Sequence, residues 1–81
     1  MDAHVKIIMP AYNAEKTIKK SIEAILSQTH KDWTLYIVDD GSTDLTSNIL
    51  TWYEKTPRIK IFHTANKGVS AARNYGLHNA L

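Results

Sequence analysis

IVDDGSTD (residues 37–44) places two apolar residues directly before two adjacent carboxylates, a glycine and a run of hydroxyl side chains. An apolar run that ends in this way is typical of a buried strand that stops at a sheet edge and turns at once. Two like charges at such an end are costly unless hydrogen-bond donors meet them. We therefore expect Asp39 and Asp40 to lie in a polar crevice at the end of a strand.

Two further segments have the short, β-branched pattern of strands. VKIIM (residues 5–9) precedes Pro10, which cannot donate to a strand ladder, and we expect this strand to end there and to be buried on both faces. WTLYIVD (residues 33–39) is the strand that leads into the two acids, and RIKIFHT (residues 58–64) is the third.

The segments between the strands have the spacing of amphipathic helices. Residues 14–28 repeat apolar side chains on one helical stripe, with Asn13 as the expected cap. A second helix is expected after Ser42 or Thr43 and before Pro57, and a third over residues 71–81, capped by Ser70. Four aromatic residues fall at core spacing in this scheme, namely Trp33, Trp52, Tyr53 and Phe62.

The resulting order is strand, helix, strand, helix, strand, helix. Such alternation predicts an α/β fold in which right-handed crossovers make a parallel, Rossmann-like sheet with helices on both faces. The carboxyl ends of parallel strands open on one edge, where α/β sheets bind ligands. That edge is expected to gather Pro10, Ala11, Tyr12 and Asn13 with the acid pair, and with residues 64–66.

Length and composition limit the functional classes. The chain has 81 residues, a formal net charge of +2 and no cysteine, which suits one small globular unit and excludes disulfides and thiolate metal sites. No apolar run approaches the roughly 20 residues of a membrane helix. We interpret the basic group KTIKK (residues 16–20) as the solvent-exposed face of a helix, so we expect no nucleic-acid partner.

Several ligand motifs are missing from the chain. There is no G-x-G-x-x-G after the first strand and no G-x-x-x-x-G-K-[ST], which argues against a dinucleotide fold and a P-loop. A receiver domain places its acids on the first strand, and a calcium loop starting at Asp39 requires a glutamate where Leu50 stands. The four histidines lack metal-site spacing, and the serines lack a nucleophile elbow.

The loop after the third strand provides groups that suit phosphate. Lys67, Gly68 and Arg73 surround the expected start of a helix, whose positive end, close backbone approach and forked guanidinium favour anions. A carboxylate such as Asp40 can accept the imide N–H of a pyrimidine base, and Tyr12 can flank that base, although a structural role for either residue stays open. The combination points to a nucleotide.

Three ordered motifs carry a family resemblance. The stretch VKIIMPAYNAEKTIKKSIEAILSQTHKDWTLYIVDDGSTD, followed by NKGVSAARNYGL, resembles the N-terminal nucleotide-binding half of family 2 glycosyltransferases with the GT-A fold. The resemblance implies that residues 1–81 are a single partial domain that binds a nucleotide-sugar, usually a UDP-sugar. Pro10, Ala11 and Tyr12 would line the base pocket, Asp40 would read the uracil imide and Asp39 would support the nucleoside.

The resemblance also assigns the phosphate side and the missing chemistry. Lys67, Gly68 and Arg73 would face the ribose and diphosphate. The family's Asp-x-Asp, which binds Mg²⁺ or Mn²⁺, and its general base come later in such chains, so no catalytic residue, bound metal or sugar transfer is expected of these 81 residues alone. The longer parent would transfer the sugar with inversion to a saccharide or lipid-linked acceptor, in the cytoplasm or at the cytoplasmic face of a membrane.

Two alternatives and one structural expectation remain. The chain is either part of an enzyme or a non-catalytic α/β module that binds a nucleotide or a protein. In a third interpretation the 81 residues alone bind nothing, because the pocket needs the rest of the parent. The family's sheet order resembles 3-2-1-4. Without a fourth strand, residues 5–9 would form an exposed apolar edge that favours self-association.

Overall fold

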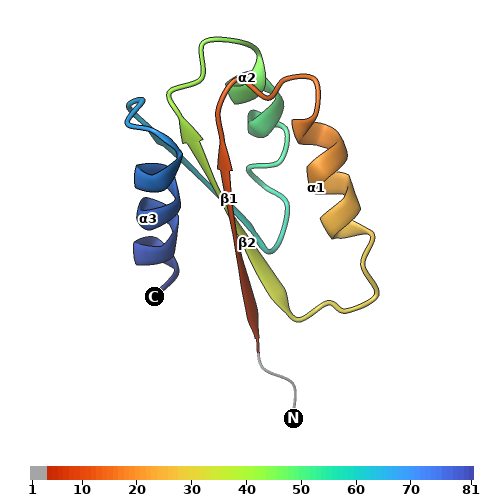
Figure 1. Ribbon diagram of the computed structural model, residues 1–81. Helices are drawn as coiled ribbons and strands as arrows, with labels where there is room; N and C mark the ends of the chain where they lie inside the picture. The colour runs from red at the N-terminus through yellow and green to blue at the C-terminus, as the bar shows by residue number, and fades with distance from the viewer. Residues whose placement is uncertain (1–3) are drawn as a thin grey trace.

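The structure is a computed structural model that describes residues 4–81, a three-stranded parallel sheet with helices on both faces (Figure 1). The order along the chain is β1 (Val5–Ala11), α1 (Ile18–Leu26), β2 (Trp33–Asp40), α2 (Thr46–Thr51), β3 (Ile59–Thr64) and α3 (Val69–Ala80). The strands are arranged β1-β2-β3, and both pairings are parallel. The predicted α/β class, with alternating strands and helices, is confirmed.

The central strand β2 has a packed layer on each side. Trp33, Leu35 and Ile37 are fully buried in the cluster that α1 and α2 cover. Val38 points the opposite way, toward α3. Figure 1 shows α3 on one side of the sheet and α1 and α2 on the other. Because side chains alternate along a strand, the same strand end presents residues to two different layers.

Gly76 explains how closely α3 approaches the sheet. A Cβ atom at this position would lie 2.8 Å from Ile8 Cγ2 and 3.1 Å from Val38 Cγ2. Glycine weakens a helix locally, but here it lets the helix backbone pack directly on the side chains of β1 and β2. The low helix propensity of this glycine is therefore accompanied by closer packing of the helix on the sheet.

The expectation that the first strand is buried on both faces and ends at Met9 is wrong in two ways. Val5 and Lys6 are exposed, and the residues that follow are only half-buried until Ala11. The strand also continues through Pro10, which pairs with Val38. Within residues 4–81, β1 is an edge strand with one neighbour, and an edge position tolerates proline and leaves side chains accessible.

The expected helix caps are also corrected. Helix α1 starts at Ile18 after a turn in which the amides of Thr17 and Ile18 donate to the carbonyl of Ala14, so Asn13 is not its cap. At the start of α2 the backbone N–H of Thr46 donates a hydrogen bond to Asp44 Oδ1 at 2.9 Å, so the side chain that accepts it is Asp44 and not the expected Ser42 or Thr43.

Helix α3 begins at Val69, and its N-cap is Gly68, two residues before the expected cap Ser70. Each of the three helices therefore begins elsewhere than the sequence suggested.

One of the four aromatic residues expected in the core lies outside it. Trp33 and Tyr53 are buried and Phe62 is half-buried, whereas Trp52 is 87% exposed. Helix α2 ends at Thr51, so Trp52 belongs to the turn that follows and leaves the apolar stripe that the helical spacing predicted.

Candidate functional site

The carboxyl ends of the three strands lie side by side at one edge of the sheet. Ala11 pairs with Asp39, and Asp40 pairs with Thr64 in the parallel register. The loops that follow these strands therefore meet above the same edge. This is the geometry that the alternating sequence pattern predicted.

The two adjacent acids point to opposite faces of the sheet. Asp39 is in contact with Ser47 of α2, while Asp40 contacts the loop before α3. Both are almost completely buried, with 2% and 3% of their surface exposed. Strand alternation thus separates the two like charges into different environments, each with its own donors, which lowers the cost of placing them next to each other in sequence.

Asp39 has a structural role in the turn after β2. Its Oδ1 accepts a hydrogen bond from the amide of Ser42 at 3.2 Å, and its Oδ2 accepts from the Ser47 hydroxyl and lies 3.0 Å from His63 Nδ1. Burial by itself would raise the pKa of Asp39, but the hydrogen bonds from Ser42, Ser47 and His63 outweigh it and keep the pKa below its ordinary value. Asp39 is therefore a carboxylate fixed by donors on three sides.

Asp40 connects β2 to the loop between β3 and α3. Its two carboxylate oxygens accept the backbone N–H groups of Lys67 and Gly68, each at 2.9 Å. These donors come from the loop after β3, because the Ser42 amide in the adjacent turn donates to Asp39 instead. Each carboxylate oxygen has more than one lone pair, so Asp40 retains acceptor capacity on a side chain that its loop already orients.

A cavity of about 460 Å³ opens beside Asp40 at this edge. Its lining consists of side chains and backbone from the ends of β1 and β2 and from the start of α3, namely Pro10, Ala11, Tyr12, Asp40, Asn66, Gly68 and Val69. Five of these seven were selected from the sequence. The other two flank the Lys67–Gly68 pair: Asn66 was expected at this edge among residues 64–66 without a binding role, and Val69 was not selected.

A smaller hollow of about 140 Å³ shares Asp40 with the main cavity. Lys67 contributes to its wall, together with Thr64 and Tyr75. The side chain of Lys67 is exposed, so its ammonium group is accessible at the same strand edge as the buried carboxylate. Acid and base thus occur on neighbouring walls.

The structure does not bring three of the selected residues into these hollows. Asn13 links two loops, because its backbone N–H donates to Ser42 Oγ at 3.0 Å and its side-chain Oδ1 accepts the backbone N–H of Thr43 at 2.8 Å. Asp39 faces the α2 side, and Arg73 is exposed on α3 without lining either hollow. Asn13 and Asp39 therefore act here as supports for the loops.

Gly41 lets the turn after β2 pack against the loop after β3. Its φ is +67°, and a Cβ at this position would lie 2.7 Å from the backbone nitrogen of Asn66. A side chain there would collide with the loop that donates to Asp40. The glycine in the acid motif is thus required by a close backbone approach as well as by its conformation.

Residues 4–81 contain neither a ready metal site nor a membrane-spanning helix. Among residues 4–81, no three His, Asp or Glu side chains are placed so that they can bind a metal ion together. None of the helices in that range has the length and apolar character required to cross a lipid bilayer.

Comparisons with known proteins agree with the fold. The family model for glycosyl transferase family 2 matches residues 6–81. An uncharacterized glycosyltransferase of Rickettsia felis is 44% identical over 80 residues, covering 99% of this chain and 13% of that protein. The chain therefore spans about an eighth of that relative's length.

Two solved structures superimpose on nearly the whole chain. Residues 1–349 of TarS from S. aureus match with a TM-score of 0.84 and 29% identity, over 98% of this chain and 25% of that one. The mannosyltransferase PcManGT from Pyrobaculum calidifontis, solved in complex with GDP-Man and Mn²⁺, matches with a TM-score of 0.83 and 27% identity over 96% and 24%. Both likenesses concern one portion of a longer chain.

Proposed function

The chain belongs to glycosyl transferase family 2, and we propose that its residues form the nucleotide-binding part of a nucleotide-sugar donor site. The observation that carries the proposal is the cavity beside Asp40, where a buried and already oriented carboxylate lies among Pro10, Ala11 and Tyr12. In this proposal residues 1–81 are one partial domain of a longer transferase. The family match favours this role over that of a non-catalytic binding module.

The cavity has complementary groups for a base. The Tyr12 ring is half exposed at its mouth and can stack on a planar heterocycle. Asp40 can accept one N–H from the base while it keeps both loop amides. Uracil presents such a donor at its imide nitrogen, whereas the corresponding nitrogen of cytosine is an acceptor. This difference favours uracil over cytosine, and a UDP-sugar is the partner that we propose.

The phosphate side of the proposal rests on the start of α3. Lys67 and Gly68 precede this 12-residue helix, whose N-terminal end carries partial positive charge. We assign Lys67 and Gly68 to the ribose and diphosphate. Arg73 is exposed on α3, so its proposed contact with phosphate requires a ligand that extends out of the cavity along the helix. Asp39 would support the nucleoside through the turn that it orders.

Metal and acceptor chemistry belong to other parts of the proposed enzyme. The complex of PcManGT with Mn²⁺ supports a divalent cation, Mg²⁺ or Mn²⁺, in the parent, but residues 4–81 do not bring together a set of ligands that fits one. Transfer with inversion to a saccharide or lipid-linked acceptor stays part of the proposal. We also propose that the parent is located in the cytoplasm or at the cytoplasmic face of a membrane. A chain without cysteine is compatible with that location.

The open edge of β1 supports a further part of the proposal. Within residues 4–81 this strand pairs only with β2, so the backbone groups on its other side have no partner strand. Its apolar residues Ile7, Ile8 and Met9 are only half-buried. An unpaired apolar edge is a template for another strand. We expect the 81-residue chain to self-associate at high concentration, and a monomer throughout a concentration series in light scattering would contradict this.

The test of the nucleotide site compares UDP with CDP by calorimetry. Because CDP lacks the imide donor, we expect the chain to bind UDP at least about tenfold more tightly, and we expect Asp40→Asn to abolish that preference. Asp32→Asn is the control for loss of one carboxylate charge, since Asp32 is exposed at the opposite end of the sheet, where it contacts His4. An unchanged preference in Asp40→Asn would remove Asp40 from base recognition, and failure of both nucleotides to bind would refute binding by this chain.

A further inference from the structure

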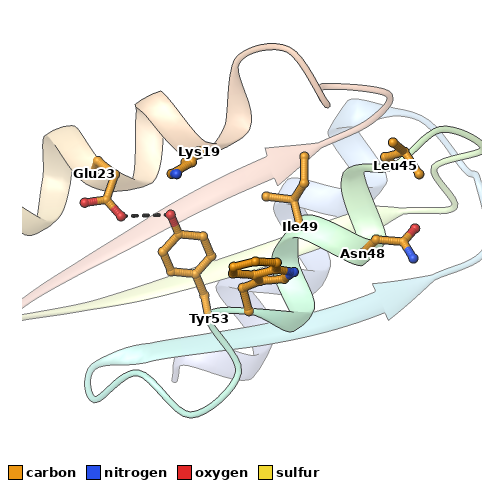
Figure 2. A pocket seen from close by; sticks show the side chains of 7 residues that line it. Lys19, Glu23, Leu45, Asn48, Ile49 and Tyr53 are labelled. Atoms are coloured by element: carbon orange, nitrogen blue, oxygen red, sulfur yellow. Dashed lines mark hydrogen bonds between the residues drawn. The ribbon is translucent and has the colours of Figure 1, made fainter.

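A second hollow of about 460 Å³ lies between α1 and α2, on the face of the sheet opposite α3 (Figure 2). Residues 19–23 of α1 form one wall, and residues 45–53 of α2 and its following turn form the other. It shares no lining residue with the cavity beside Asp40. We call it the α1/α2 groove, and its size is within the usual range of small-ligand sites.

An exposed indole ring dominates the groove. Trp52 lines it with 87% of its surface exposed, whereas the other tryptophan, Trp33, is 1% exposed in the core. Leu45 is also exposed, and Ile49 is half-buried beneath the groove. Large apolar side chains clustered on a surface in this way mark a place where a ligand can gain by covering them.

The groove also carries polar groups of both signs. Figure 2 shows Lys19 and Glu23 on α1 opposite Asn48 and Tyr53 on the other wall. Glu23 Oε2 accepts a hydrogen bond from the Tyr53 hydroxyl at 2.8 Å, which orients that carboxylate and leaves its second oxygen as an acceptor. The exposed amide of Asn48 offers both donors and an acceptor. One cation balances one anion, so the groove is not built for a strongly charged ligand.

A pyranose ring matches this combination of groups. Its axial C–H bonds form an apolar face that can lie flat on an indole, while its hydroxyls both donate and accept hydrogen bonds around the rim. We propose that the α1/α2 groove binds a pyranose unit of a saccharide, with one C–H face on Trp52 and hydroxyls directed to Glu23 and Asn48. This inference rests on the proposed role of the chain in a glycosyltransferase, whose substrates are sugars. It does not depend on the nucleotide site at Asp40.

The test is saturation-transfer NMR with the methyl pyranosides of glucose, galactose, mannose and N-acetylglucosamine, each at about 10 mM, which suits a weak one-ring contact. We expect transfer to the protons of one ring face from at least one glycoside. Trp52→Ala should reduce this binding at least about tenfold. The Trp52 side chain is almost fully exposed, so the variant should unfold at the same urea concentration as the wild type.

Two controls separate this site from the rest of the protein. Leu77→Ala removes another exposed apolar side chain, on α3 across the sheet, and should leave the transfer unchanged. Excess UDP should leave it unchanged as well, because the two hollows share no lining residue, so nucleotide binding and sugar binding are distinguished. Equal transfer in Trp52→Ala and wild type, or no transfer from any of the four glycosides, would overturn the proposal.

A second copy of the chain is the other possible occupant, and acrylamide quenching of tryptophan fluorescence identifies it. Trp33 is 1% exposed and Trp52 is 87% exposed, so quenching by acrylamide reports mainly on Trp52. Protection that appears when glycoside is added at fixed protein concentration supports the proposal. Protection that grows with protein concentration in the absence of sugar would show that another chain covers the groove and would overturn it.

Discussion

Replacing Gly41 with alanine tests whether the site depends on close packing between two loops. The new Cβ would lie 2.7 Å from the backbone nitrogen of Asn66 and 3.1 Å from its Cβ, at a residue whose φ is +67°. A left-handed conformation costs an alanine about 1–2 kcal/mol, and forcing an atom into a packed contact costs about 1–3 kcal/mol more. The total, about 2–5 kcal/mol, is comparable with the whole stability of a domain of this size.

The steric part of this cost has a specific consequence for Asp40. To relieve the contact, the loop that contains Asn66 has to move, and the next two amides in that loop are the ones that donate to Asp40. We therefore expect Gly41→Ala to reduce the hydrogen-exchange protection of the Lys67 and Gly68 amides more than that of amides in the strands. Urea unfolding measures the free-energy loss, and NMR hydrogen exchange locates it.

A second substitution at the same position separates the steric effect from backbone strain. Asparagine tolerates the left-handed region better than alanine but carries the same Cβ, so Gly41→Asn should still destabilise the protein by at least about 1 kcal/mol. Asn66→Gly should not rescue either variant, because the nearest contact is a backbone atom. If Gly41→Asn and Gly41→Ala both leave stability and the two loop amides unchanged, the close approach of the loops is refuted.

The remaining predictions concern protonation. Burial and the hydrogen bond to Glu23 raise the pKa of Tyr53 to about 12, so the stability that neutral Tyr53 contributes is complete below about pH 10 and is lost as the pH rises from there through about 12. Tyr53→Phe should remove the latest step in a near-ultraviolet phenol titration, and an unchanged titration would show that another tyrosine titrates last. Asp39 has a lowered pKa, so the stability it contributes is present above the ordinary carboxyl value and is lost as the pH falls below about 4. Asp39→Asn should lower stability at neutral pH and flatten the acid limb of urea midpoints, whereas an acid limb parallel to that of the wild type would exclude Asp39 as a contributor.

The strand pattern around residues 37–44 predicts the position of the two acids and also their opposite orientation. Short β-branched runs predicted three strands, helical spacing predicted three helices, and their order predicted a common edge, and the structure confirms all of these. The alternation of side chains along a strand implies that Asp39 and Asp40 face opposite ways, although both were expected in one crevice. The structure places Asp39 against Ser47 and Asp40 against the loop after β3.

Trp52 shows where periodicity alone fails. Its spacing from Leu45 and Ile49 continues a helical stripe, but the helix ends at Thr51 and the ring turns outward. At the end of α2 the Trp52 and Tyr53 amides donate to the carbonyls of Ile49 and Leu50, three residues back instead of four, so the last turn tightens and the helix stops. The exposed ring and the groove beside it therefore had no sequence signal.

The amino-acid sequence was sufficient to determine the order of strands and helices, the parallel connections and the edge at which polar residues gather, because these follow from local periodicity. They did not determine which donors satisfy Asp40, why Gly41 and Gly76 are needed, or that Trp52 is exposed. Asp40 and its donors Lys67 and Gly68 are 27 and 28 residues apart in the chain. Contacts of that separation exist only once β2 lies between its two neighbours, and only the tertiary structure brings those loops within hydrogen-bonding distance.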